Sequence, residues 1–255
     1  MPSEVRCLAR GPPITPSTRI HELARVERDV VACRRCPRLN AWREEAARHP
    51  PRRFSGQRYW AKPVPAFGDP AARILIVGLA PAAHGGNRTG RVFTGDASGD
   101  FLFPALHAVG LANQPEARHP EDGLALSGAL ISAVCRCAPP DNRPLPEEIE
   151  NCREYLEREL ALLPRPRVLV ALGKLAFDRS LLALQAGGAA LPRPRPRFTH
   201  GTRVRIGEDV LFASYHPSQQ NTFTGKLTQK MLRDVLRRAV REARRVGGEG
   251  ETRAR

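Results

Sequence analysis

Apolar residues form four short and nearly continuous runs along the chain. The runs cover residues 73–77, 129–134, 167–173 and 210–215, and they are rich in Val, Ile, Leu and Ala. Apolar runs of this length, bounded by turn residues, are typical of strands that are buried on both faces of a parallel sheet. The pattern therefore predicts four parallel strands.

Between these runs, apolar residues recur at helical spacing. Ile20, Leu23, Val26 and Val30 predict a helix over residues 19–32. Similar patterns predict further helices over residues 101–109 and 147–163, from Lys174 onward, and over residues 225–246, where the helix is strongly basic. Strands that alternate with helices predict an α/β fold in which helices cover both faces of a parallel sheet.

The chain reads as one folded unit between two polar ends. Residues 1–18 are rich in Pro, Ser and Arg without periodicity and predict a disordered leader, residues 19–246 a single domain, and residues 247–255 a disordered tail. No apolar run approaches the ~20 residues of a membrane span, so we expect no membrane association. No hydrophobic signal segment follows Met1, which predicts a cytoplasmic protein.

A long glycine-rich segment, residues 78–100, follows the first predicted strand. Strand-to-helix connections usually take about 2–6 residues, and longer loops at the carboxyl ends of parallel strands often carry ligand sites. Motif-bearing loops also follow the second and fourth predicted strands, so all three can meet at one edge of the sheet. The alternative is an ordinary surface loop.

The chain is strongly basic, with 41 Lys and Arg against 26 Asp and Glu, a net charge of +15. Such an excess indicates a polyanionic partner, nucleic acid first and an acidic membrane second. The alternative is a genome-wide preference for arginine. The basic helix over residues 225–246 is open to the same two interpretations, a nucleic-acid contact or a solvated face.

Cysteines are grouped in a way that favours a metal site over disulfides. Cys33 and Cys36 form a C-x2-C unit, and Cys137 and Cys152 form a second, wider pair. Four thiolates suit either a structural zinc ion or a [4Fe–4S] cluster, and the wide second spacing favours the cluster. Cys135 lies two residues from Cys137 and competes with it as a ligand, whereas Cys7 lies in the predicted leader and is not assigned.

Three segments together carry a family resemblance: GLAP at residues 78–81, RCAPP at 136–140 with Cys152 after it, and HPSQQN at 216–221. They resemble the type-5, iron–sulfur branch of the uracil-DNA glycosylase superfamily, over residues 20–238. The resemblance implies a three-layer α/β/α sandwich around a four-stranded parallel sheet. It also implies an enzyme that flips a damaged nucleotide out of DNA and hydrolyses its N-glycosidic bond.

The same resemblance implies a structural [4Fe–4S] cluster on Cys33, Cys36, Cys137 and Cys152, since the Cys-Ala-Pro-Pro motif selects Cys137 over Cys135. It implies two partners, double-stranded and single-stranded DNA containing deaminated bases, and we expect a monomer. Two other classes of protein remain alternatives. One is an iron–sulfur redox protein on a similar sheet, and the other is a DNA-binding module without catalysis.

His216 is the catalytic residue that the resemblance assigns, through a hydrogen bond to uracil O2 as negative charge accumulates there. Ala80 stands where the best-studied branch has an aspartate, so another group must stabilise the sugar cation or orient the water. Asp96 is the replacement candidate, with helix capping as the competing role. Asn142 is a second polar candidate.

The resemblance also indicates residues that bind the substrate. Phe93 matches an aromatic residue that stacks on the flipped base, with burial in the core of its own loop as the alternative. Ala133 stands where a related branch has an asparagine that reads uracil, which predicts broader specificity, including deaminated purines such as hypoxanthine. The remaining predicted pocket residues are Gly78, Ala80, Pro81 and Ser218.

Residues 218–226 are expected to press into the duplex as the base leaves it. Asn221 belongs to this segment and is a predicted DNA contact. Arg88, Arg91 and Lys226 are predicted contacts to phosphates, each with a generic surface charge as the alternative. The net charge of +15 predicts DNA binding that weakens with salt.

Overall fold

The computed structural model describes residues 15–252, and within them the strands form a six-stranded sheet in the order β1-β3-β2-β4-β6-β5. The four central strands run parallel to one another, and they confirm the four predicted strands. They are β3 (Ala129–Ala133), β2 (Ile74–Gly78), β4 (Val168–Leu172) and β6 (Asp209–Ser214).

The two edge strands were not predicted. β1 (Phe67–Gly68) pairs antiparallel with β3, and β5 (Arg203–Ile206) pairs antiparallel with β6. β1 has only two residues, and β5 exposes two arginines, so neither carries an apolar run. Both strands leave the parallel centre of the sheet intact.

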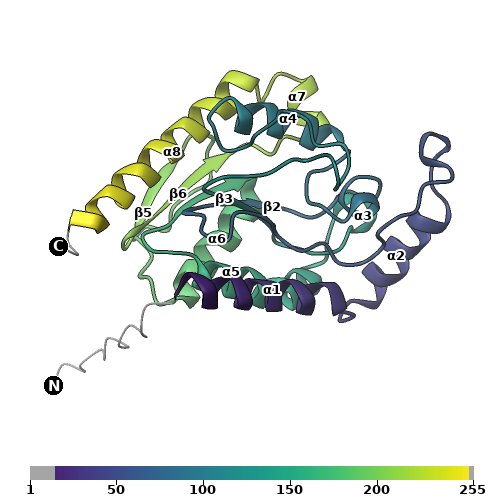
Figure 1. Cartoon of the computed structure of the whole chain (residues 1–255), viewed down its shortest axis with the longest axis horizontal. Coiled ribbons are helices and arrows are strands. Elements are labelled where there is room, and N and C mark those ends of the chain that lie inside the picture. Colours follow the sequence, from purple (N-terminus) through teal and green to yellow (C-terminus); the bar gives the residue numbers. More distant parts are fainter. Residues whose placement is uncertain (1–14, 253–255) are drawn as a thin grey trace.

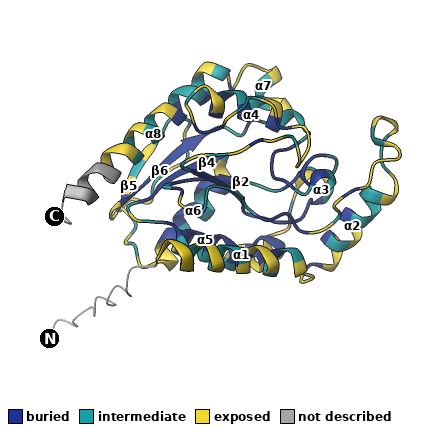
Figure 2. Ribbon diagram, viewed as in Figure 1, coloured by how far each residue is buried: buried dark blue, intermediate teal, exposed yellow. Residues whose placement is uncertain are grey.

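Helices cover both faces of the sheet, as predicted (Figure 1). α4 (Ala97–His107) and α8 (Gln229–Thr252) pack on the face to which Ile74 and Ile76 belong. α5 (Pro146–Leu162) and α6 (Lys174–Ala186) pack on the face that carries Leu75 and Val77. Because both faces are covered, the central strands are buried throughout (Figure 2), and the fold is a three-layer α/β/α sandwich.

Two N-terminal helices extend the layer formed by α5. α1 (Pro16–Ala32) packs against α5 through Val26, Val30 and Tyr155. Thr15 caps α1, so residues 16–18 belong to a helix and not to the predicted leader, whose residues 1–14 lie outside the described part of the chain. α2 (Pro37–Arg48) was not predicted.

The C-terminal helix differs from its prediction at both ends. α8 begins at Gln229 because the shorter helix α7 (Gln219–Phe223) and a turn precede it. It continues to Thr252, so the tail predicted from residue 247 is helical as far as it is described. Among the described helices, none is both long enough and apolar enough to cross a bilayer.

The strand order reverses direction at β2, and this identifies the edge of the sheet where a ligand site is expected. β2 has β3 on one side and β4 on the other, so the chain leaves β2 in one direction and later returns past it. Open α/β sheets bind ligands at the carboxyl ends of their strands, where such a reversal occurs. The loops that follow β2, β3, β4 and β6 all begin at this edge.

Candidate active site

Phe93 and His216 lie together at the carboxyl edge of the sheet. Phe93 belongs to the long loop after β2, and His216 comes two residues after the end of β6. Their ring centroids are 6.0 Å apart, and the ring planes meet at 34°. The structure therefore brings two predicted site residues from distant parts of the sequence into contact.

The backbone of Phe93 is held in a conformation that this residue type rarely adopts. Its φ is 53°, in the left-handed region. A Cβ on Gly78 would lie 2.7 Å from the Phe93 ring, and a Cβ on Gly99 would lie 1.8 Å from the Phe93 carbonyl oxygen. Both positions need glycine, because only its bare backbone lets Phe93 approach so closely. The ring is thereby fixed, with 8% of the residue exposed.

His216 is surrounded by protein while keeping a partly exposed surface. Burial lowers its pKa to about 4, so the imidazole is neutral at neutral pH. No described residue hydrogen-bonds to its ring. A neutral imidazole has one N–H donor and one acceptor nitrogen, and both remain available to a ligand.

Asp96 caps helix α4. Its Oδ1 accepts a hydrogen bond from the Gly99 backbone N–H at 3.0 Å, which confirms the capping role. A Cβ on Gly85 would lie 2.1 Å from Oδ2, so that oxygen lies directly over the Gly85 backbone. Burial raises the pKa of the carboxyl above its ordinary value, although part of the side chain still meets solvent. Capping fixes the carboxylate in place and leaves a catalytic role open.

The remaining predicted pocket residues line the same edge of the sheet. Gly78 pairs in register with Ala133, and both are buried. Pro81 is buried beneath Gly86, and half-buried Ala80 packs against the cysteines. The end of β3 therefore carries a buried methyl group, that of Ala133, beside Gly78.

The segment after His216 is organised around that residue. Ser218 is half-buried at the start of α7. Asn221 donates from Nδ2 to the His216 backbone carbonyl at 2.9 Å, and its predicted contact with DNA stays a prediction. Lys226 is exposed, with Nζ 4.9 Å from the Tyr215 ring centroid. Asn142 is exposed in the short helix η2 (Pro140–Asn142).

The prediction that Arg91 contacts a phosphate is wrong. The residue is 5% exposed, and its Nη2 forms two hydrogen bonds of 2.9 and 2.7 Å with the Asp122 carboxylate. Its Nε donates to Thr94 Oγ1, so the guanidinium holds the loop together from inside. Arg88 is half-buried and donates to the carbonyl oxygens of His84 and Gly95.

The five described cysteines come from three segments of the chain, residues 33–36, residues 135–137 and Cys152 on α5. Cys36, Cys135, Cys137 and Cys152 share one buried cluster, and half-buried Cys33 is the C-cap residue of α1. A buried ion pair, Arg136 to Glu159 at 2.6 Å, fixes the loop after β3 to α5. Across residues 15–252, no three Cys, His, Asp or Glu side chains converge as ligands of one metal ion, so the cluster stays a prediction. Cys7 lies outside the described residues.

Comparison with known proteins places this architecture. The sequence model of the "Uracil DNA glycosylase superfamily" matches residues 65–239. The type-5 uracil-DNA glycosylase of Thermus thermophilus is 53% identical over 215 residues, covering 84% of this chain and 95% of that protein. The chain belongs to the type-5 uracil-DNA glycosylase family. The type-5 uracil-DNA glycosylase of Mycobacterium tuberculosis is 49% identical, and the match covers 84% of this chain and 79% of that protein. The type-5 uracil-DNA glycosylase of Pyrobaculum aerophilum is 48% identical, and the match covers 84% of this chain and 90% of that protein.

The structure adds a residue of this type-5 chain that the sequence did not single out. Arg43 on α2 is fully buried and donates from Nη1 to Cys137 Sγ at 3.1 Å. Its Nε and Nη2 have no partner in the described part of the chain, and no described carboxylate pairs with it. Burying a cation without a nearby anion costs free energy of folding, so a negatively charged group beside Arg43 would stabilise the protein. An iron–sulfur cluster on thiolates carries negative charge and fits that requirement.

Proposed function

We propose that this chain excises uracil from DNA by hydrolysing the N-glycosidic bond, the first step of base excision repair. The observation that carries the proposal is the neutral, unpartnered imidazole of His216 beside the fixed ring of Phe93. The activity in the names of the type-5 relatives supports it.

Phe93 supplies a rigid apolar face for the flipped base. An enzyme that acts on a base must take it out of the helical stack and replace the stacking that is lost. The left-handed backbone of Phe93 and its contacts with Gly78 and Gly99 fix the ring before substrate arrives. Little ordering entropy is therefore spent when the base binds.

His216 stabilises the departing base. Negative charge develops on the uracil ring as the glycosidic bond breaks, and an imidazole N–H aimed at O2 binds that charge more strongly than the neutral base. Because burial holds the pKa near 4, the imidazole is a neutral donor. Asn221 fixes the backbone from which the ring extends.

Asp96 acts on the opposite side of the reaction. The ionised carboxylate stabilises the positive charge on the sugar or orients the attacking water, which Ala80 is unable to do. Its hydrogen bond to Gly99 holds the carboxylate in place. Asn142, exposed in η2, is the second polar candidate.

The pocket accepts bases other than uracil. The methyl group of Ala133 replaces an amide that would pair with one edge of uracil, and it is buried opposite Gly78. A site without a matched hydrogen-bonding group discriminates less among bases. Hypoxanthine, the product of adenine deamination, is therefore a second substrate.

A [4Fe–4S] cluster on Cys33, Cys36, Cys137 and Cys152 would hold the N-terminal helices against the loop after β3 and against α5. Support comes from the thiol chemistry and from the buried cation Arg43 beside Cys137. Asn151 also donates to Cys36 Sγ, at 3.5 Å. When bound, the cluster would link these segments of the chain to one another. The groups that act in the hydrolysis are protein side chains alone.

The DNA partner includes double-stranded and single-stranded forms, and the protein acts as a monomer. The positive charge of the chain and exposed cations such as Lys226 support binding to phosphates. The five described cysteines form no disulfide bond with one another, which supports a reducing compartment such as the cytoplasm.

One assay tests this function. The protein is incubated with a duplex that contains one uracil, one that contains one hypoxanthine, and a matched thymine control, followed by alkali. We expect strand cleavage at uracil and hypoxanthine and none at thymine. Tight DNA binding without cleavage would instead identify a non-catalytic module. Undetectable hypoxanthine excision under conditions that clear uracil would refute the broad specificity.

A further inference from the structure

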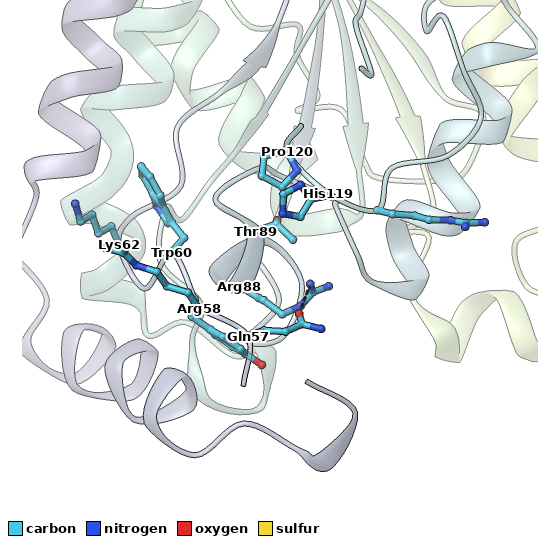
Figure 3. Close-up of a pocket in the computed structure, with 10 residues that line it drawn as sticks. Gln57, Arg58, Trp60, Lys62, Arg88, Thr89, His119 and Pro120 are labelled. Atoms are coloured by element: carbon cyan, nitrogen blue, oxygen red, sulfur yellow. Dashed lines mark hydrogen bonds between the residues drawn. The ribbon is translucent and has the colours of Figure 1, made fainter. Parts of the chain in front are cut away.

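A hollow is lined by three segments of the chain, residues 57–62, residues 88–89 and residues 118–120 (Figure 3). Its volume is about 740 Å³, within the range of about 300–1,000 Å³ found for ligand sites. Arg58, Trp60, Lys62, Arg88, Arg118 and His119 are among the residues that line it. None of these groups takes part in the proposed hydrolysis. We call this hollow the Trp60 groove.

The charge of the Trp60 groove is entirely positive. Arg58, Lys62, Arg88 and Arg118 line it, and no described lining residue is acidic. The guanidinium groups of Arg58 and Arg118 are exposed and make no hydrogen bond to a described residue. Elsewhere on this surface, arginines are commonly paired with carboxylates, as in Arg34 with Glu44. An unpaired set of cations around a hollow is complementary to a chain of phosphates.

Trp60 presents a fixed aromatic surface within these cations. It is 36% exposed, and a Cβ on Gly90 would lie 2.9 Å from its ring, so one part of the indole rests directly on that glycine. Its Nε1 donates to the Pro63 carbonyl at 3.1 Å, which fixes the ring orientation. An exposed aromatic ring among cations is the combination that binds single-stranded nucleic acid, because an unstacked base can stack on it.

Hydrogen bonds connect the Trp60 groove to the loop of residues 78–100, which carries Phe93 and Asp96. The backbone N–H groups of Trp60 and Ala61 donate to the carbonyls of Arg88 and Asn87, at 2.9 and 3.0 Å. Arg88 in turn donates from Nη2 to the carbonyl of Gly95, the residue before Asp96. A strand bound in this groove would therefore contact the loop that holds the catalytic carboxylate.

We propose that the Trp60 groove binds unpaired nucleotides of the DNA strand, with phosphates on Arg58 and Arg118 and one base stacked on Trp60. Unpaired nucleotides are favoured over duplex because the bases of a duplex are already stacked on one another. We take the bound strand to be the one that carries the lesion, and this part of the proposal rests on the proposed function. Binding itself requires no catalysis.

The test uses the full chain and DNA without uracil, so that a failure of the proposed function does not affect it. Trp42→Phe leaves Trp60 as the remaining tryptophan, and its fluorescence is titrated with oligo-dT. We expect quenching that weakens with salt. Anisotropy of labelled oligo-dT then compares wild type with Trp60→Ala and with Arg58→Glu/Arg118→Glu, for which we expect binding weakened at least about tenfold.

The charge-matched control is Arg25→Glu/Arg153→Glu, on α1 and α5, which should bind oligo-dT close to wild type. Circular dichroism checks that every variant is folded. Unchanged oligo-dT affinity in the Trp60 and arginine variants would overturn the proposal. An equal loss for a blunt duplex would assign the groove to duplex DNA instead. If inorganic phosphate alone quenched the Trp60 fluorescence as strongly as oligo-dT does, the Trp60 groove would be a site for small anions and not for a DNA strand.

Discussion

The Asn221 side chain donates a hydrogen bond from Nδ2 to the backbone carbonyl of His216, at 2.9 Å. The first turn of α7 therefore holds the segment from which the imidazole of His216 extends. The last residue of the motif His-Pro-Ser-Gln-Gln-Asn thus fixes the backbone of the first, because Asn221 is hydrogen-bonded to His216.

Asn221→Ala should lower the single-turnover rate of uracil excision about tenfold, because a small displacement of a catalytic group is costly. Affinity for uracil-free duplex should stay unchanged, since the amide is occupied inside the protein. Gln220→Ala, on the exposed neighbouring residue, is the matched control. A loss of DNA affinity with an unchanged excision rate would show that Asn221 contacts DNA after all.

The pH dependence of excision should report on Asp96. Burial raises the pKa of Asp96, whereas it lowers that of His216 to about 4, so the imidazole stays neutral above about pH 5. Asp96 must be ionised to act, so the single-turnover rate should fall as the pH drops through its raised pKa. Asp96→Asn should remove this acid limb and lower the plateau at least about tenfold. An acid limb that persists in Asp96→Asn belongs to another group.

Gly85→Ala tests Asp96 without altering the carboxylate. The new methyl would lie 2.1 Å from Asp96 Oδ2 and 2.8 Å from its Cβ, so the side chain must move and the cap of α4 is lost. We expect excision to fall at least about tenfold and the fold to lose about 1 kcal/mol of stability. Gly187→Ala, where the new methyl meets only ordinary contacts of 3.4 Å and beyond, is the control. Normal excision by Gly85→Ala would separate Asp96 from catalysis.

Arg43→Met should change stability in opposite directions with and without the cluster. In the iron-loaded protein the substitution removes a compensating cation, so iron should be released faster to a chelator and the Tm should fall. In the metal-free protein it removes an uncompensated buried charge, so the Tm should rise. Arg48→Met, at the exposed end of α2, is the control. A Tm shift of the same sign in both forms would mean that Arg43 does not compensate the cluster.

The buried centre of the fold could be predicted because its signal is local. Each of the four parallel strands is a continuous apolar run, and the two edge strands are too short or too exposed to show one. α2 was missed because its buried face includes Arg43, a residue type that normally indicates the surface.

Residues of the candidate site could be predicted only where they belong to a recognisable sequence motif. His216 and Phe93 stand in recognisable segments, and the sheet edge brings them together. The role of Arg91 depends on Asp122, 31 residues away, and nothing in the local sequence reveals that partner. The tie from Asn221 to a main-chain carbonyl is equally invisible in sequence, because it depends on the turn that α7 makes.

In the proposed reaction, the neutral imidazole of His216 stabilises the departing base. The most direct measurement is the single-turnover rate of uracil excision by His216→Ala at saturating enzyme, with duplex affinity and Tm as controls. We predict a rate at least about 100-fold below wild type, with affinity and Tm preserved. A rate within about threefold of wild type would contradict the account.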